Sequence, residues 1–161
     1  NPQITSINVK KLPLQKYDLI AISDYNKGFL TEDDIRYICA HHTCVFVDTK
    51  KPVGDFLNKS TFIKINEKEY KRSLPLSKHL KQKIIFTKAE SGAEFNNTLY
   101  PTEKIEVKDS TGAGDSFFAA LIVRYAETGD IKKSIVFANI CATEVVQHKG
   151  VSVIKRPRAN S

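Results

Sequence analysis

Residues 109–118, DSTGAGDSFF, combine small residues, acids and the start of an apolar helix pattern. Gly112, Ala113 and Gly114 allow a backbone to approach a ligand closely, and N–H groups at a helix start form a site for an oxyanion. Asp115, in the first helical turn, could accept a proton from a hydroxyl that attacks a phosphorus atom. The alternative is a glycine-rich turn in which Asp115 only caps the helix. The helix pattern over 117–123 is apolar all round, so we expect a buried helix whose amino end is held in a fixed orientation.

Apolar strand patterns alternate with helix patterns along the chain. Strands that are apolar on both faces and alternate with helices predict a parallel sheet covered on two sides, so the fold class is α/β. Ligands of such sheets bind at the carboxyl ends of the strands. The informative loops therefore begin at Asp24, Asp48, Asn66, Thr87 and Lys108. The expected strands are 17–23, 45–48, 61–65, 84–87 and 151–154, with antiparallel β over 93–107; the expected helices are 31–41, 66 onward, 76–81, 113–128 and 131–148.

Length and composition exclude several classes of protein. The chain has 161 residues, enough for one domain or a piece of a larger one, and 41% of them are hydrophobic. We expect a cytoplasmic protein with reduced cysteines, because there is no membrane-length apolar run, no signal peptide and only three cysteines. Since methionine is absent, we also expect a fragment or processed form. The net charge of +7 is scattered without interleaved aromatics, which disfavours nucleic-acid binding and suits a small anionic substrate.

The segment DSTGAGDSFFAALI resembles the second signature of the PfkB (ribokinase-like) carbohydrate kinases, D-x-x-G-A-G-D. The resemblance implies a ribokinase-like, doubly wound, mostly parallel sheet in three αβα layers. It also implies ATP and Mg²⁺ as cofactors. Asp115 would be the catalytic base that deprotonates the sugar hydroxyl, with Gly112, Ala113 and Gly114 as the anion hole.

Other segments lie where this family places its ligands. Asn66 and Glu69 are similar to the N-x-x-E motif that helps to hold Mg²⁺, partly through water, although alone the pattern is typical of a helix cap. The segment TKAESG, from Thr87 to Gly92, looks like the family's nucleotide loop. The resemblance also assigns Thr111 and Asn139 to the nucleotide and phosphate site. It assigns Asp109, Gly150 and Ser152 to a site for a monovalent cation (K⁺).

Within the family, IAISDYNKGFLT resembles the S-D-Y-x-K-G-x-L-T segment of the heptose 7-phosphate kinases of ADP-heptose and lipopolysaccharide core synthesis. VFVDTKKP resembles their V-D-P-K-G strand end, with Thr49 in place of Pro and Lys51 in place of Gly. These kinases phosphorylate the anomeric hydroxyl of D-glycero-D-manno-heptose 7-phosphate. A substrate that already carries a phosphate needs a cation, and Lys27 and Lys50 are the candidates, with an ordinary exposed lysine as the alternative for Lys27.

The resemblance covers only the carboxyl-terminal half of such a kinase, the half with the nucleotide site and the base. We therefore expect residues 1–161 to be a partial kinase domain with a flexible basic tail at 155–161, inactive on its own. A missing amino-terminal half or a second chain, as in a homodimer, should cover the sheet edge beside residues 17–23. The alternatives are a non-catalytic half-kinase that binds nucleotide or a partner chain, and a kinase for a different sugar.

Overall fold

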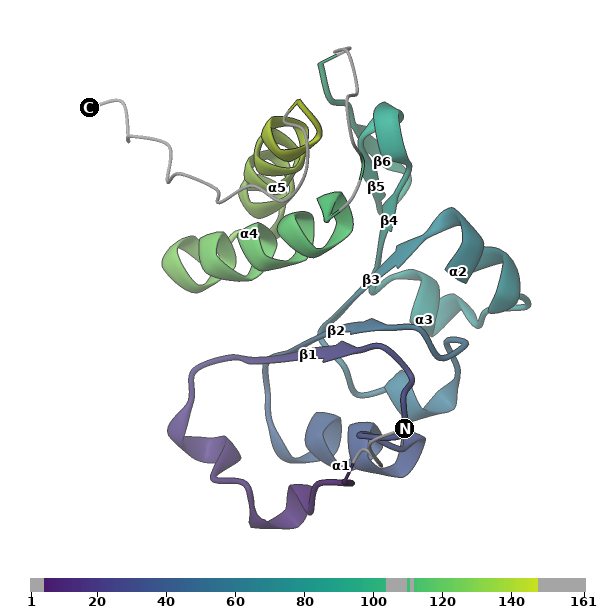
Figure 1. Ribbon diagram of the computed structural model, residues 1–161, viewed down its shortest axis with the longest axis vertical. Helices are drawn as coiled ribbons and strands as arrows, with labels where there is room; N and C mark the ends of the chain where they lie inside the picture. Colours follow the sequence, from purple (N-terminus) through teal and green to yellow (C-terminus); the bar gives the residue numbers. More distant parts are fainter. Residues whose placement is uncertain (1–4, 104–109, 111, 148–161) are drawn as a thin grey trace. The chain divides into compact units, whose positions relative to one another are not determined.

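The computed structural model of the chain describes residues 5–103, 110 and 112–147 (Figure 1). The described residues divide into two compact units, one drawn from positions 1–89 and 93–99 and the other from positions 90–92 and 100–161. The elements up to the last strand are η1 (Val9–Lys11), η2 (Leu14–Lys16), β1 (Ile20–Asp24), α1 (Glu32–His41), β2 (Val45–Thr49), η3 (Asp55–Leu57), β3 (Phe62–Asn66), α2 (Glu67–Arg72), α3 (Lys78–Lys81), β4 (Ile84–Thr87), η4 (Ala89–Ser91), β5 (Ala93–Phe95) and β6 (Thr98–Tyr100). Two long helices follow, α4 (Ala113–Thr128) and α5 (Ile131–Val146).

The six strands within the described residues form one sheet in the order β1-β2-β3-β4-β5-β6. Strands β1 to β4 are parallel, and β5 runs antiparallel to β4. Ile22, Val47, Ile63 and Ile84 lie in register across the parallel strands. Parallel strands in sequential order need crossover connections, and right-handed crossovers place these connections on one face of the sheet. The predicted, mostly parallel α/β sheet is confirmed.

The core of the first unit lies between α1 and one face of the sheet. Thr31 begins α1 with a capping box, in which its hydroxyl accepts from the Asp34 N–H and its own N–H donates to the Asp34 carboxylate. Ile35 and Ile38 then point from α1 into the core that Val47 and Ile63 supply from the strands. Burying such side chains contributes about 1.5–3 kcal/mol each relative to exposure. This packing fixes the parallel strands, and with them the loops at their carboxyl ends.

On the opposite face of the sheet, aromatic side chains near the amino ends of the parallel strands give way to charged side chains near the carboxyl ends of β2 and β3. The rings of Phe46 and Phe62 lie 5.1 Å apart, and those of Phe62 and Phe95 lie 5.7 Å apart. Two residues further along their strands, on the same face, lie Asp48 and Lys64, which are register partners. The change from rings to charges therefore occurs at the carboxyl ends of β2 and β3.

The first strand differs from its prediction. A strand buried on both faces was expected over 17–23, whereas β1 covers Ile20–Asp24 and leaves Ala21 and Ser23 exposed. The physical reason is its position, because β1 lies at the edge of the sheet and only the Ile22 side faces the core. A hollow of about 330 Å³ lies beside it, lined largely by apolar residues that include Leu12, Tyr17 and Phe29. The sheet edge predicted beside residues 17–23 is present in the part of the chain that the structure describes.

The second unit is built on the pair α4 and α5. The bounds of α4 agree with the prediction, and Gly112 and Gly129 flank it in left-handed conformations. The prediction of a helix buried all round is wrong, because α4 packs one face against α5 and leaves Val123 52% exposed. The predicted strand 151–154 and the basic tail lie outside the described residues. None of the described helices combines the length and the apolarity that a membrane span requires.

Candidate active site

Polar side chains gather where the four parallel strands end. Asp24 ends β1, Thr49 ends β2, Asn66 ends β3 and Thr87 ends β4. Because the strands are parallel, these four positions lie along the same edge of the sheet. The sheet therefore brings together the loops that sequence analysis singled out in the first unit.

Asn66 and Glu69 form the first turn of α2. The Asn66 side chain accepts a hydrogen bond of 2.9 Å from the Glu69 N–H, and Glu69 Oε2 accepts one of 2.9 Å from the Asn66 N–H. This reciprocal capping box satisfies two N–H groups at the helix start. The N-x-x-E motif thus has the capping role that its pattern allowed, and its two side chains are fixed at the end of β3.

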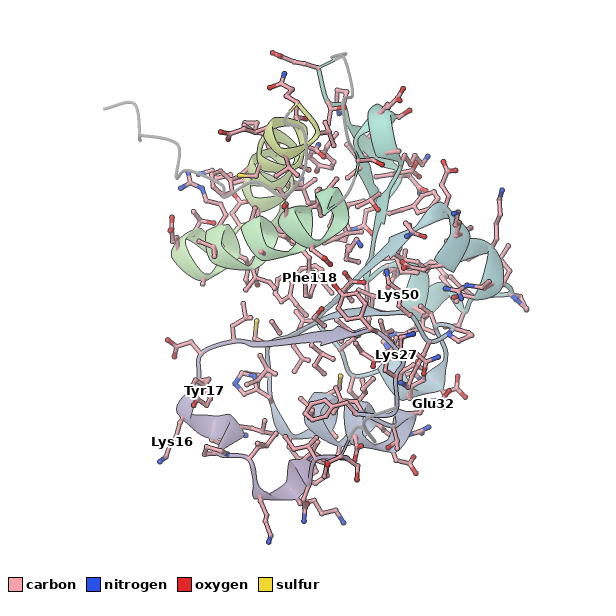
Figure 2. All side chains as sticks on the ribbon, in the orientation of Figure 1. Lys16, Tyr17, Lys27, Glu32, Lys50 and Phe118 are labelled. Carbon is pink, nitrogen blue, oxygen red and sulfur yellow. The ribbon has the colours of Figure 1, made fainter. Side chains whose placement is uncertain are left out.

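Lys50 approaches Glu69 from the loop after β2. Its Nζ lies 2.6 Å from Glu69 Oε1, and Glu69 is 4% exposed. Burial acts to raise the pKa of Glu69, but the hydrogen bonds from Lys50 and from the Asn66 N–H outweigh it, and the pKa is lowered. Figure 2 shows Lys50 and Lys27 at the same end of β1 and β2, where the loops following both strands lie. Lys27 is exposed on its loop.

Asp48 and Lys64 form a second ion pair near the carboxyl ends of β2 and β3, and this pair is buried on both sides. Lys64 Nζ lies 3.2 Å from Asp48 Oδ2, and both residues are buried. Within the described residues, the buried Asp48 Oδ1 has no hydrogen-bond partner. Burial raises the pKa of Asp48, although Lys64 and Lys50 act in the opposite direction. We call Asp48, Lys64, Glu69 and Lys50 the charge quartet.

Asp24 is held in a separate network at the end of β1. Its Oδ2 accepts hydrogen bonds from Thr49 Oγ1 at 2.6 Å and from Lys51 Nζ at 2.9 Å. Lys51 Nζ also lies 3.0 Å from Asn26 Oδ1. Burial opposes ionisation of Asp24, but the bonds from Thr49 and Lys51 lower its pKa. Thr49 and Lys51, the two departures from the heptose-kinase pattern, therefore tie the loop after β2 to the loop after β1.

The predicted nucleotide-site residues make structural contacts. Thr87 Oγ1 donates to the Ile65 carbonyl at 3.3 Å, and Asn139 Nδ2 donates to the Tyr100 carbonyl at 2.8 Å. Gly92 has a φ of +99°, and a Cβ there would lie 2.1 Å from Tyr100 O. Glycine is required at this position by both backbone conformation and space.

The second unit carries the predicted anion hole and base at the start of α4. Gly112 is the N-cap, with a φ of +80°, and its carbonyl accepts from the Ser116 N–H at 2.9 Å. The Ala113 N–H donates to the Ser110 carbonyl at 3.2 Å, while Gly114 and Asp115 are exposed. A helix start of this kind offers N–H groups and the positive end of the helix dipole to an anion. The remaining predicted site residues, Asp109, Thr111, Gly150 and Ser152, lie outside the described residues.

The structure brings Asn66, Glu69 and Lys50 into one contact network. Sequence analysis did not single out Lys64, Asp48 or Lys51 as members of a site. A signal for the first existed, because Lys64 is a lysine in the middle of the apolar strand pattern TFIKI, and a buried charge requires a partner. The partner, Asp48, is found only through the register between β2 and β3.

The chemistry of these side chains suits a hard cation. Mg²⁺ prefers oxygen ligands, and the carboxylates of Glu69 and Asp48, with the orphan Asp48 Oδ1, supply them. The described residues contain no cluster of three or more His, Cys, Asp or Glu that could hold a metal by itself. A Mg²⁺ ion at this place would therefore complete its coordination with water and substrate oxygens.

Comparison with known sequences gives one family. Residues 6–157 match the pfkB family carbohydrate kinases. The bifunctional protein HldE of a Nitratiruptor species is 34% identical over 166 residues, which cover 91% of this chain and 36% of that protein. HldE of Campylobacter curvus is 30% identical over 181 residues, covering 92% of this chain and 38% of the relative. The chain thus spans little more than a third of the length of these curated relatives.

Comparison with solved structures agrees on the fold. Ribokinase from Thermotoga maritima superposes with a TM-score of 0.69 at 17% identity, covering 89% of this chain and 56% of that one. Arabidopsis thaliana ribokinase, solved with ribose and ATP, gives a TM-score of 0.68 at 18% identity, covering 92% of this chain and 55% of that one. The ribokinase-like fold predicted for the chain is therefore confirmed.

Proposed function

Because the chain belongs to the pfkB family of carbohydrate kinases, we propose that it forms the carboxyl-terminal half of an ATP-dependent sugar kinase. The observation that carries this proposal is the start of α4. Gly112, whose backbone has a left-handed conformation, caps the amino end of α4. Asp115 follows in the first turn of this helix and is exposed to solvent. A helix start with a carboxylate beside it can both stabilise a phosphoryl group and accept a proton.

In the proposed reaction, the Asp115 carboxylate takes the proton of the sugar hydroxyl. The hydroxyl oxygen forms a bond to the γ-phosphorus of ATP, and the bond between that phosphorus and the β–γ bridging oxygen breaks, which releases ADP. The amides of Gly112, Ala113 and Gly114 stabilise the charge on the transferring group. A bound Mg²⁺ neutralises phosphate charge, and Asn66 and Glu69 would hold it, partly through water. A monovalent cation (K⁺) beside the anion hole, at Asp109, Gly150 and Ser152, is part of the same proposal.

The proposed acceptor is the anomeric hydroxyl of D-glycero-D-manno-heptose 7-phosphate. Its support is the likeness to the HldE proteins and the position of two lysines. Lys27 and Lys50 lie on the loops at the carboxyl ends of β1 and β2, where a sugar phosphate needs a cation. Thr87, Gly92, Thr111 and Asn139 would line the nucleotide site. A missing amino-terminal half would supply the remaining substrate contacts and cover the exposed edge of β1.

The test is single-turnover phosphoryl transfer from ATP, measured with the 161-residue chain alone and after fusion to the amino-terminal kinase half of a relative. We expect transfer only in the fused protein. Asp115→Asn should lower it by about 10²-fold or more, the contribution of a general base, without weakening ATP binding. Asp33→Asn is the matched control, because Asp33 lies in the first turn of α1 and its side chain is 94% exposed. Equal rates for Asp115→Asn and Asp33→Asn would refute the proposed base.

The second candidate is a half-kinase that binds nucleotide or a partner chain without turnover. Three hydrogen bonds favour it, because both Glu69 oxygens already accept one within the chain and the Ala113 N–H donates to the Ser110 carbonyl. ATP binding that survives in a fused protein that transfers no phosphate to heptose 7-phosphate, ribose or another sugar would support this candidate.

A further inference from the structure

Lys50 and Glu69, which the proposed function assigns to different ligands, share one ion pair. Lys50 Nζ lies 2.6 Å from Glu69 Oε1, and the Asn66 N–H occupies Glu69 Oε2. The two partners differ in their access to solvent, because the side chain of Lys50 is 38% exposed and that of Glu69 is 4% exposed. A lysine has a long, flexible stem, so its ammonium group can leave the pair while Glu69 stays in its helix turn.

Asp48 presents an unused oxygen to the same cluster. Its Oδ2 is paired with Lys64, whereas its Oδ1 is buried without a hydrogen-bond partner among the described residues. Asp48 precedes Lys50 by two residues, and its register partner Lys64 precedes Asn66, the cap of the helix that carries Glu69, by two residues. A buried carboxylate oxygen without a donor is unfavourable, so a cation that reached it would gain a strong interaction.

We propose that the Lys50 ammonium group occupies, in the absence of ligands, a divalent-cation site formed by Glu69 and Asp48, and that it moves to a phosphate group when a divalent cation enters. This inference rests on the proposed function, since it concerns the metal and phosphate of that site. The ammonium group and the metal ion compete for Glu69 Oε1, and the metal ion would also reach the unpartnered Asp48 Oδ1. The displaced Lys50 then carries its charge to an anion, so metal and phosphate each tighten the binding of the other by the same factor.

The first test measures binding of Mn²⁺ alone to the purified chain by electron paramagnetic resonance of free Mn²⁺. Lys50→Gln removes the competing ammonium group and should bind Mn²⁺ about tenfold more tightly than the unchanged chain. Lys71→Gln makes the same change on exposed α2 surface and should stay within about twofold. Asp48→Asn in the Lys50→Gln background should reverse the gain. Lys50→Arg keeps the cation and should resemble the unchanged chain.

The second test adds inorganic phosphate to the same titration. Phosphate should tighten Mn²⁺ binding about fivefold in the unchanged chain and have no such effect in Lys50→Gln. Equal Mn²⁺ affinities of Lys50→Gln and Lys71→Gln, or an equal phosphate effect in both, would overturn the inference. Neither measurement needs turnover, so failure of the kinase reaction and failure of this exchange are distinguishable. Far-UV circular dichroism of each variant verifies that the fold is kept.

Discussion

Replacing Lys64 by Met tests whether the Asp48–Lys64 ion pair is as buried as its contacts indicate. The change leaves Asp48 in a buried position without the Lys64 ammonium group, whose Nζ lies 3.2 Å from Asp48 Oδ2. Removing one partner of a buried ion pair costs about 3–5 kcal/mol of unfolding free energy. Because Lys50 also acts on Asp48, we expect the lower end of this range, about 3 kcal/mol near neutral pH.

The pH dependence of this loss has a definite sign. Burial raises the pKa of Asp48 above its ordinary value of 3.8, and Lys64 partly opposes that rise, so Lys64→Met raises the pKa further. A carboxyl with a raised pKa in the folded state favours folding below its unfolded pKa, and this contribution is lost as pH rises through the folded value. The penalty of Lys64→Met should therefore be smaller at about pH 4 than at about pH 7.

Urea denaturation followed by far-UV circular dichroism at both pH values measures the effect. Lys68→Met on the exposed surface of α2 is the control and should change the unfolding free energy by less than about 0.5 kcal/mol. The double variant Lys64→Met with Asp48→Asn removes both charges, so it should cost less than the sum of the single variants. A loss below about 1 kcal/mol for Lys64→Met, or strict additivity of the pair, would refute the reasoning.

Three further changes have definite expected outcomes. Gly92→Ala places a Cβ 2.1 Å from Tyr100 O at a φ of +99° and should lower the thermal midpoint strongly, by more than Gly112→Ala, where no atom lies within 4 Å; similar shifts would contradict the close contact. Asn66→Ala removes the cap of α2 and should cost about 1 kcal/mol in urea unfolding, and no loss would show that the capping box is dispensable. Lys51→Met removes a donor to Asp24 and should raise the pKa of that carboxyl in an NMR titration. An unchanged pKa would show that the hydrogen bond from Lys51 does not lower the pKa of Asp24.

The elements with strong local signals could be predicted from the sequence. The bounds of β4 and α4 agree with expectation, because an apolar run ends at Thr87 and two glycines delimit the long helix. The cap at Asn66 was also visible, since an acid follows three residues later. These signals depend only on neighbouring residues.

The burial of whole faces could not be predicted in the same way. Strand β1 reads as an apolar run, yet it lies at the edge of the sheet and one of its faces is exposed. The middle of α4 is apolar all round, yet Val123 is half exposed. Apolar composition shows that a surface can be buried, whereas position in the sheet or helix pair decides whether it is.

The candidate site was predictable residue by residue but not as a network. Asn66, Glu69 and Lys50 were named from motifs, while their shared contacts depend on the alignment of β2 with β3. Lys51 stood out only as a departure from a family pattern, and its bond to Asp24 spans 27 positions in the sequence. Contacts over such separations follow from tertiary structure, which no local pattern encodes.

The open side of β1 limits how a complementing polypeptide could bind to the chain. Among the described residues β1 hydrogen-bonds to β2 alone, and it is only five residues long. So short a strand offers few main-chain bonds to a newcomer, too few to hold it by themselves. A complementing polypeptide must therefore do two things at once, extending the sheet past Ile22 and filling the apolar hollow of about 330 Å³ next to it. Co-production with such a complement should raise the yield of the chain, while surplus single pieces would tend to associate through their bare strands.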